Sequence, residues 1–351
     1  MSNSQVIMIT GATSYEGDQL SRLLLDDTSH RVIGVDQTAP QVPLHDRLDF
    51  VQADVRNRLL ADLLRLEGVS TVYHLGWQSM NGGHPPLALA SLLAACAAAG
   101  VAHLVWVSHT AVYGPHPTNA AFISEDQPPY TKNTGGQVAD LVAGEQLCFE
   151  FAQTHPELQI TVLRPAHLIG PRLASPLTRY LAGAAAPILL GFDPMMQLLD
   201  ERDLLRALVY ALAADPVRHD NERIPSNLYY YNLAAEGVMP LTKLLSLTHT
   251  LPLPLAHPLA YWATSLLRST PWSVEQVVPY GWDFLRYRCV GATERQAAWG
   301  FGPRYSGLEA IKGLAAYKQE GKTAVSAPDL AVDEARLKQT LARRQQVKEA
   351  R

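Results

Sequence analysis

Residues 6–17 read VIMITGATSYEG, an apolar run that enters a tight turn between Gly11 and Gly17. A second apolar run, RVIGVD at residues 31–36, ends on Asp36. A strand, a glycine turn, a helix and a second strand with a terminal acid make up the first half of a dinucleotide-binding βαβ unit. We therefore expect an α/β fold that is built around this unit.

The same alternation of short apolar runs and helical patterns continues to about residue 165. The predicted strands are Val6–Thr10, Arg31–Asp36, Leu48–Gln52, Thr71–Leu75, Ala102–Ser108 and Gln159–Arg164. The predicted helices between them are Glu16–Leu25, Arg58–Leu66, Leu87–Ala99 and Gly136–Thr154. Such alternation predicts a Rossmann-type, doubly wound parallel sheet with helices on both faces. Ligands of such sheets bind at the carboxyl ends of the strands.

The pattern divides the chain into three parts. Residues 1–165 are predicted to form the dinucleotide-binding Rossmann domain, to which later segments can return. Residues 166–321 are predicted to form a smaller C-terminal α/β lobe that binds substrate, and residues 322–351 a charged helical tail. Within the second lobe, residues 259–268 form an apolar helical pattern. We interpret this pattern as a core helix, with a lid or a membrane-surface contact as the alternative.

Composition and charge exclude several classes of protein. The 351 residues include 18% charged side chains and carry a net charge of −4 without a basic stripe, so nucleic-acid binding is not expected. Three widely spaced cysteines favour neither a disulfide framework nor a zinc site, and they point to the reducing cytoplasm. The polar N-terminus predicts no signal peptide. The uncharged stretch 87–107 is divided by Gly100 into a helix and a strand, so no membrane span is expected.

The glycine turn has the chemistry of a phosphate-binding site, with two departures. Gly11 can adopt the backbone angles of the turn, and Gly17 lets the helix pack close to the strand. Amides at the helix N-terminus would face a pyrophosphate. Ser14 replaces the glycine that usually lets the backbone approach phosphate, and Glu16 adds a negative charge nearby.

The acid at the end of the second strand indicates which dinucleotide is bound. Asp36 can accept hydrogen bonds from ribose hydroxyls and would repel a 2′-phosphate, so the predicted cofactor is NAD rather than NADP. The alternative is an acid that only forms a turn. Asp54 is expected to meet the adenine amino group, and Gly76 to allow a close approach to the cofactor. The predicted cofactor-binding residues are Gly11, Thr13, Ser14, Tyr15, Gly17, Asp36, Asp54, Val55, Leu75, Gly76, Ser108 and Pro165.

The order of these segments resembles the extended short-chain dehydrogenase/reductase family, in particular its NAD-dependent epimerase/dehydratase group. The matching segments are TGAT at 10–13, Asp36, DV at 54–55, VYHLG at 72–76, VSHTAVYG at 107–114, LRPA at 163–166, GP at 170–171, LDERD at 199–203, YNL at 231–233 and GFGPRY at 300–305. The resemblance covers roughly residues 6–317. It implies a small-molecule substrate between two lobes and a homodimer that forms through helices 87–99 and 136–154.

The resemblance breaks at the family's usual proton donor. Family members carry a YxxxK pair on the long helix, with a glutamate four residues after the lysine. When Glu145 is taken as that glutamate, Gln137 stands at the tyrosine position and Leu141 at the lysine position. Glutamine cannot act as such an acid, and leucine carries no charge. The resemblance therefore implies an atypical member that keeps the cofactor site without its usual chemistry.

Other residues are candidates for the missing acid. His109 stands where the family usually has Ser or Thr, is expected at a strand end near the nicotinamide, and titrates in the useful range. Tyr130 and Lys132 precede the long helix but lack the one-turn spacing that would bring them together. A structural role for His109 and Tyr130 is the alternative. The predicted catalytic residues are His109, Thr110, Tyr130 and Gln137, and no histidine spacing typical of a metal site occurs.

Three functional hypotheses follow from these residues. The first is an NAD(H)-dependent oxidoreductase or epimerase-like enzyme with a non-standard proton donor. Its substrate would be a small molecule, and the Leu, Pro and Trp content after residue 240 favours a lipid-, polyketide- or steroid-like one over a sugar nucleotide. The second is a non-catalytic sensor or scaffold that binds a dinucleotide and acts through a partner. The third is a redox-neutral lyase or cyclase that uses the same pocket.

Overall fold

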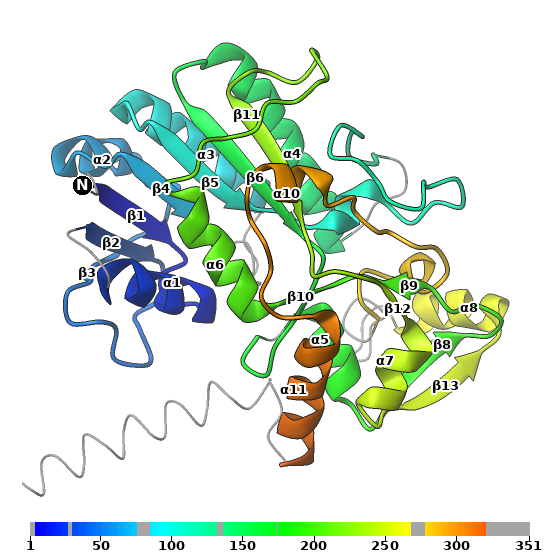
Figure 1. The fold of residues 1–351 in the computed structure, drawn as a ribbon. Coiled ribbons are helices and arrows are strands. Elements are labelled where there is room, and N and C mark those ends of the chain that lie inside the picture. The colour runs from blue at the N-terminus through cyan, green and yellow to red at the C-terminus, as the bar shows by residue number, and fades with distance from the viewer. Residues whose placement is uncertain are drawn as a thin grey trace, which may run out of the picture.

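The computed structural model describes residues 4–26, 30–75, 85–131, 136–173, 175–267 and 278–320. Its centre is a seven-stranded sheet in the order β11-β6-β5-β4-β1-β2-β3, in which all neighbouring strands are parallel (Figure 1). The strands are β1 (Val6–Thr10), β2 (Arg31–Asp36), β3 (Asp49–Gln52), β4 (Thr71–His74), β5 (His103–Val107), β6 (Gln159–Pro165) and β11 (Leu228–Leu233).

Helices cover both faces of this sheet, which confirms the predicted Rossmann-type, doubly wound fold. On one face, α1 (Tyr15–Asp26) packs against α6 (Glu201–Ala211). On the other, α3 (Pro85–Ala99) lies between α2 (Leu60–Glu67) and α4 (Gly136–Thr154) (Figure 1). The central strands are buried on both sides, as expected for a parallel sheet between helical layers.

The six predicted strands and four predicted helices of the first 165 residues are all present, with bounds that differ by no more than two residues. Two later segments also join this part of the molecule. The strand β11 pairs with β6, and α6 packs on α1. The domain boundary at residue 165 therefore stays a prediction. Residues 201–211 and 228–233, which follow it in the sequence, belong to the layers of the main sheet.

The remaining elements are smaller, and many of them pack around a second apolar core. Leu181, Leu244 and Ile311 are fully buried in it. The two-stranded sheets pair β7 (His167–Ile169) with β10 (Leu198–Asp200), β9 (Met195–Met196) with β12 (Met239–Pro240), and β8 (Ala185–Leu189) with β13 (Leu251–Leu255). The helices are α5 (Pro176–Ala182), α7 (Leu241–Leu247), α8 (His257–Leu267), α10 (Glu294–Ala298) and α11 (Gly307–Gln319), with short 3₁₀ turns η2 (Thr110–Tyr113) and η3 (Trp282–Leu285).

The predicted apolar helix at residues 259–268 corresponds to α8, although Arg268 lies outside the described residues. Trp262 on this helix is 63% exposed, whereas Trp282 is buried. The predicted tail, residues 322–351, also lies outside the described part of the chain. No helix within the described residues is long and apolar enough to cross a membrane.

Candidate functional site

The turn between β1 and α1 depends on both of its glycines. Gly11 has a φ of 78°, a conformation that residues with a side chain rarely adopt. A Cβ at Gly17 would lie 2.2 Å from the carbonyl oxygen of Gly11, so only glycine lets α1 begin this close to β1. The Ser14 hydroxyl accepts a hydrogen bond from the Gly17 N–H at 3.0 Å and donates one to the Gly11 carbonyl at 2.7 Å. Ser14 therefore acts as a cap that holds the turn closed.

The Asp36 carboxylate is fixed beside this turn. One oxygen accepts hydrogen bonds from the Thr13 N–H at 3.1 Å and from the Thr13 hydroxyl at 2.6 Å. The other accepts from the backbone N–H and the hydroxyl of Thr38, both at 3.2 Å. Four donors hold a charged, half-buried group at the carboxyl end of β2, next to the N-terminus of α1. This is the position that the sequence predicts for a ribose-binding acid.

Glu16 lies in the first turn of α1 and is the group that departs most from a phosphate site. Its Oε1 is buried and has no hydrogen-bond partner among the described residues. Burial raises the pKa of this carboxyl, and its own backbone N–H partly offsets that effect.

Tyr15 connects the turn to a second buried carboxyl that was not predicted. Its hydroxyl donates a hydrogen bond to Glu201 at 3.3 Å, and the other Glu201 oxygen accepts from the Arg172 N–H at 3.3 Å. A Cβ at Gly170 would lie 1.9 Å from this carboxylate, so the glycine makes room for it. Burial, and then the nearby charge of Asp200, raise the pKa of Glu201 to about 7. The only signal in the sequence was an acid within LDERD, which is also what a helix N-terminus prefers.

Glu201→Gln is expected to change how the stability of the protein depends on pH. In the folded protein the pKa of Glu201 is about 7, above the 4.5 of an exposed glutamate. Because the folded state then holds this proton more tightly than the unfolded chain, stability falls as the pH rises from 4.5 to 7. Glutamine does not titrate and can still accept from Arg172. Between these pH values, the free energy of unfolding should fall by roughly 2–3 kcal/mol more in the wild type than in the variant. Urea unfolding at both pH values measures this difference, and parallel pH dependences would contradict it.

The other predicted cofactor residues differ in how accessible they are. Asp54 is half-buried after β3, but Arg56 donates to both of its carboxylate oxygens and lowers its pKa. Val55 is half-buried. Leu75 is buried, and its N–H donates to the Thr10 carbonyl at the end of β1. Gly76 lies outside the described residues. Pro165 ends β6 and is buried beside β11.

Ser108 belongs to a buried ionic network. Its hydroxyl donates to the Glu145 carboxylate at 2.6 Å. The same carboxylate receives a bidentate pair from the Arg164 guanidinium, with a closest distance of 2.5 Å. All three residues are at most 1% exposed. This hydroxyl is therefore engaged with Glu145 inside the network.

The network extends from Arg164 to β11. Arg164 also donates to the Tyr113 hydroxyl at 2.8 Å, and Tyr113 donates to the Asn232 side chain at 2.7 Å. Asn232 in turn donates its backbone N–H to Glu125 at 3.0 Å. The Arg164 guanidinium lies 4.1 Å from the centre of the Tyr230 ring. These contacts join β6, β11, η2 and the loop around residue 125 at the carboxyl edge of the sheet.

The predicted catalytic residues do not form one cluster. His109 is 2% exposed and caps η2, where its Nδ1 accepts the Ala111 N–H at 2.8 Å. Thr110 is buried, and its carbonyl accepts from the Cys289 thiol. Tyr130 packs on Gly114, with its ring centre 5.9 Å from that of His116, and not on His109.

The long helix α4 carries the remaining residues of the expected YxxxK region. Gln137 is half-buried in its first turn, and Leu141 is 2% exposed in the apolar core. Neither side chain can supply an ionisable proton. Lys132 lies outside the described residues.

Two residues that the sequence did not single out lie next to His109. The ring centres of His167 and Tyr280 are 5.3 Å and 4.7 Å from that of His109. His167 begins β7, just beyond the end of β6, whereas Tyr280 lies much later in the chain. A histidine shortly after the LRPA segment was the only available signal.

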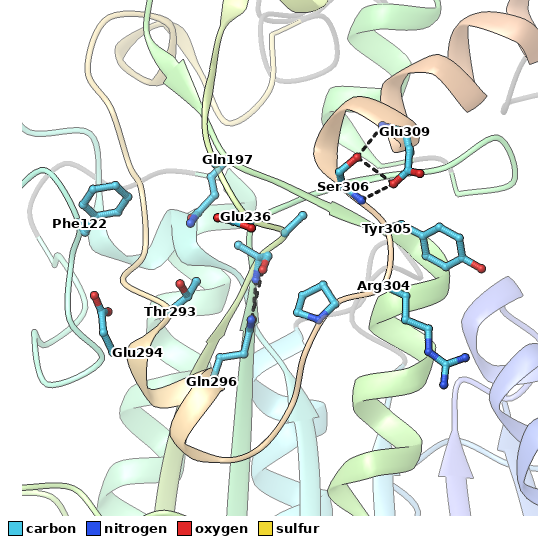
Figure 2. A pocket seen from close by; sticks show the side chains of 14 residues that line it. Phe122, Gln197, Glu236, Thr293, Glu294, Gln296, Arg304, Tyr305, Ser306 and Glu309 are labelled. Atoms are coloured by element: carbon cyan, nitrogen blue, oxygen red, sulfur yellow. Dashed lines mark hydrogen bonds between the residues drawn. The ribbon is translucent and has the colours of Figure 1, made fainter.

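A separate cavity of about 570 Å³ lies beyond the end of β11 (Figure 2). It is lined by residues 234–237, by α10 and by the N-terminus of α11, where Ser306 and Glu309 form a capping box. Its charged groups include Glu236, Glu294 and Arg304. None of the predicted cofactor or catalytic residues is among its lining residues. Within the described chain, no three His, Cys, Asp or Glu side chains are placed to hold a metal ion.

A glycine turn after the first strand, an acid fixed at the end of the second and a doubly wound parallel sheet define a Rossmann-type dinucleotide fold. The chain belongs to the NAD dependent epimerase/dehydratase family, whose sequence model matches residues 7–224. The resemblance predicted from the sequence is thereby confirmed.

Curated proteins from two bacteria are similar to this chain in sequence. An uncharacterized protein of Mycobacterium tuberculosis is 30% identical over 326 residues, which cover 88% of this chain and 82% of the relative. A protein of Bacillus subtilis, named as an uncharacterized UDP-glucose epimerase, is 31% identical over 194 residues, which cover 47% of this chain and 57% of that protein.

Solved structures share the fold at low sequence identity. MoeE5 in complex with UDP-glucuronic acid and NAD is 21% identical, with a TM-score of 0.64, over 90% of this chain and 99% of that one. UDP-glucuronic acid 4-epimerase from Bacillus cereus, in complex with UDP-glucuronic acid and NAD, is 18% identical, with a TM-score of 0.66, over the same shares. These complexes contain sugar nucleotides, so they give no support to the expected apolar substrate.

Proposed function

We propose that this protein binds NAD(H) at the glycine turn and uses it in a redox step on a small molecule that carries a hydroxyl or carbonyl group. The observation that supports this most is the Asp36 carboxylate, which Thr13 and Thr38 hold at the carboxyl end of β2. A fixed carboxylate at this position suits the adjacent hydroxyls of a ribose and disfavours a 2′-phosphate. The family of the chain and the NAD in the similar solved structures agree with this assignment.

The residues of the turn fit a dinucleotide, with one residue that opposes it. Gly11 and Gly17 bring the N-terminus of α1 against β1, where its amides attract a pyrophosphate. Ser14 points back into the turn and so does not add bulk outside it. Glu16 opposes an anion, and burial raises the pKa of its carboxyl. Because Gly11 and Gly17 favour the dinucleotide and Ser14 leaves room for it, we consider the site suitable for NAD(H).

When it is bound, the nicotinamide would supply or accept a hydride. The residues of this chain would bind and orient it: Asp36 would accept from the ribose, and the start of α1 would hold the pyrophosphate. Asp54, Val55 and Leu75 would line the adenosine side. The network around Arg164 would keep the ends of β5 and β6 in place.

We propose sugar nucleotides as the first substrate class to screen, because similar solved structures hold UDP-glucuronic acid together with NAD. Gln137 and Leu141 stand at the positions where the family usually has its catalytic tyrosine and lysine. Gln137 and Leu141 therefore favour the second candidate, a dinucleotide-binding protein without turnover. The homodimer through α3 and α4 and the cytoplasmic location stay proposals.

Calorimetric titration with NAD⁺, NADH, NADP⁺ and NADPH tests the proposed cofactor site. We expect NADH to bind more tightly than NADPH, and Asp36→Ala to weaken NADH binding about tenfold, which corresponds to the loss of a charge-assisted hydrogen bond. The matched control is Asp193→Ala. Asp193 accepts from the N–H and hydroxyl of Thr242, as Asp36 does from Thr13, but lies in the second lobe. Its loss should leave NADH affinity unchanged.

Two results would contradict the proposal. One is the absence of binding by the wild type to all four nucleotides. The other is equal NADH affinity in the wild type and Asp36→Ala. If Glu16→Gln alone bound NADH, the Glu16 carboxylate would be identified as the group that closes the site.

A further inference from the structure

Three aromatic side chains meet beyond the carboxyl ends of β5 and β6. His109 follows β5, His167 follows β6, and Tyr280 comes from the segment before η3. Their ring centres are 5.3 Å apart for the two histidines, 4.7 Å for His109 and Tyr280, and 5.9 Å for His167 and Tyr280. The carboxyl edge of a doubly wound sheet is where ligands bind in this fold. The cluster therefore occupies the expected place for a reacting group.

The hydrogen bond from Ala111 fixes the protonation of His109. Because Nδ1 accepts the Ala111 N–H at 2.8 Å, the neutral ring carries its proton on Nε2. If Nδ1 carried a proton, its N–H would point at the Ala111 N–H, and no hydrogen bond could form between two donors. Burial and the neighbouring His167 also lower the pKa of His109 well below its usual value. His109 is therefore a neutral N–H donor, which corrects its predicted role as a titrating acid.

Two buried polar atoms in the cluster are without partners. Within the described chain, neither Nε2 of His109 nor Nδ1 of His167 makes a hydrogen bond. The residues are 2% and 7% exposed. An unpaired buried polar atom is destabilising, so two of them on neighbouring rings point to a polar ligand.

Tyr280 brings a phenol ring to this cluster, whereas α4 has no tyrosine. It has a φ of 61°, which is uncommon for a residue with a side chain and which clusters at functional sites. Burial raises the pKa of its phenol, so it stays protonated at neutral pH, while the nearby Arg179 charge acts in the opposite direction. The positive charge of Arg179 would stabilise a phenolate after proton transfer, as a lysine does beside a tyrosine.

We propose that His109, His167 and Tyr280 form a catalytic site that binds the oxygen of a ketone or aldehyde, with the His109 N–H as a fixed donor and the Tyr280 hydroxyl as the proton source. This inference rests on the proposed function, since the reaction needs NADH. The carbonyl carbon receives a hydride, with its two electrons, from NADH, which leaves as NAD⁺. The electrons of the C=O π bond move to the oxygen, which takes the Tyr280 proton. The phenolate regains a proton from water.

The resting protonation states of the site suit reduction. Nε2 of His109 already carries a proton, and Tyr280 is held in its protonated form, so neither group can take a proton from an alcohol. Donors to the substrate oxygen stabilise the transition state of hydride transfer equally in both directions, so we assign the direction from these resting protons. The substrate class is then a carbonyl compound that is reduced to an alcohol.

Variants can separate a catalytic role from a structural one. His109→Asn keeps an acceptor for the Ala111 N–H, and so the cap of η2, but removes the Nε2 donor. Tyr280→Phe keeps the ring and removes the hydroxyl. NADH oxidation is measured with a UDP-4-keto sugar and with phenanthrenequinone as carbonyl probes. We expect each variant to lower kcat about a hundredfold, with NADH affinity and melting temperature unchanged. A purely structural role predicts wild-type kcat in His109→Asn.

A measurement that needs no substrate tests the protonation of His109 directly. In the full chain labelled with ¹⁵N-histidine, we expect His109 to show the Nε2–H tautomer from pH 5.5 to 8, with or without NADH. Titration in that range, or the Nδ1–H tautomer, would overturn the donor role. Wild-type kcat in Tyr280→Phe, or no oxidation of NADH with either probe by protein that binds NADH, would overturn the reductase site. A protein that binds no NADH refutes the proposed function instead.

Discussion

Replacement of Arg164 by methionine is expected to lower the free energy of unfolding by about 3–5 kcal/mol. The guanidinium is completely buried and donates to Glu145, to the Tyr113 hydroxyl and to the Glu125 carbonyl. Methionine fills a similar volume but leaves the Glu145 carboxylate without a counter-charge at 1% exposure. An uncompensated buried charge is far more destabilising than the loss of an exposed ion pair.

The matched control is Arg31→Met, because Arg31 also pairs with two carboxylates but lies at the surface. It donates to Glu67 at 2.5 Å and to Asp49 at 2.9 Å, and its side chain is 48% exposed. Its loss should lower stability by no more than about 1 kcal/mol. Urea unfolding monitored by circular dichroism compares both variants with the wild type. A loss of less than about 1.5 kcal/mol in Arg164→Met would mean that water or rearrangement compensates the Glu145 charge.

A second change tests whether the buried charge itself is responsible. Adding Glu145→Gln to Arg164→Met removes the unpaired carboxylate and keeps an acceptor for the Ser108 hydroxyl. We expect the double variant to be more stable than Arg164→Met alone, because replacing both partners of a buried pair is often close to neutral. Equal stability of the two would assign the loss to packing around Tyr113 and Tyr230.

The sequence was sufficient for the main sheet because each element carries its own local signal. Residues 6–10, 31–36 and 103–107 are short apolar runs between helical patterns, and such runs have few other ways to bury both faces. The strand β11 was harder to assign, since LYYYNL at 228–233 is separated from β6 by much of the second lobe. Its pairing with β6 depends on tertiary contacts that no local pattern encodes.

The site was predictable only where backbone geometry decides it. Gly11, Gly17 and Asp36 follow from the spacing of one βαβ unit. The hydrogen-bond partners of individual side chains do not follow from such spacing. Ser108 donates to Glu145, and His109 is fixed by the N–H of Ala111, although the sequence suggested a cofactor contact for the first and an acid for the second.

Residues that join the site from distant segments also escaped prediction. Tyr280 reaches His109 from the segment before η3, and Glu201 reaches Tyr15 from the start of α6. Each had a plausible local role in a turn or a helix terminus. Only tertiary packing of segments that are distant in sequence brings them to the carboxyl edge.

Gly17→Ala is expected to lower NADH affinity at least about a hundredfold, or about 2.7 kcal/mol, and to lower the melting temperature. The new Cβ would lie 2.2 Å from the Gly11 carbonyl oxygen and 2.8 Å from the Ala12 Cα. Both are backbone atoms, so no side chain can rotate away. The start of α1 must instead move from β1, which displaces the amides that would hold the pyrophosphate and breaks the Ser14 cap.

The same substitution at Gly313 in α11 isolates this effect, because nothing lies within 4 Å of a Cβ there. Helix propensity alone should make Gly313→Ala more stable by about 0.5–1 kcal/mol and leave NADH affinity unchanged. Calorimetry and thermal unfolding of both variants therefore separate the clash from the general effect of alanine in a helix. If Gly17→Ala melts at a lower temperature but binds NADH as the wild type does, the turn supports the fold and the dinucleotide must bind elsewhere. If it loses both, the close approach of α1 to β1 serves binding and stability together.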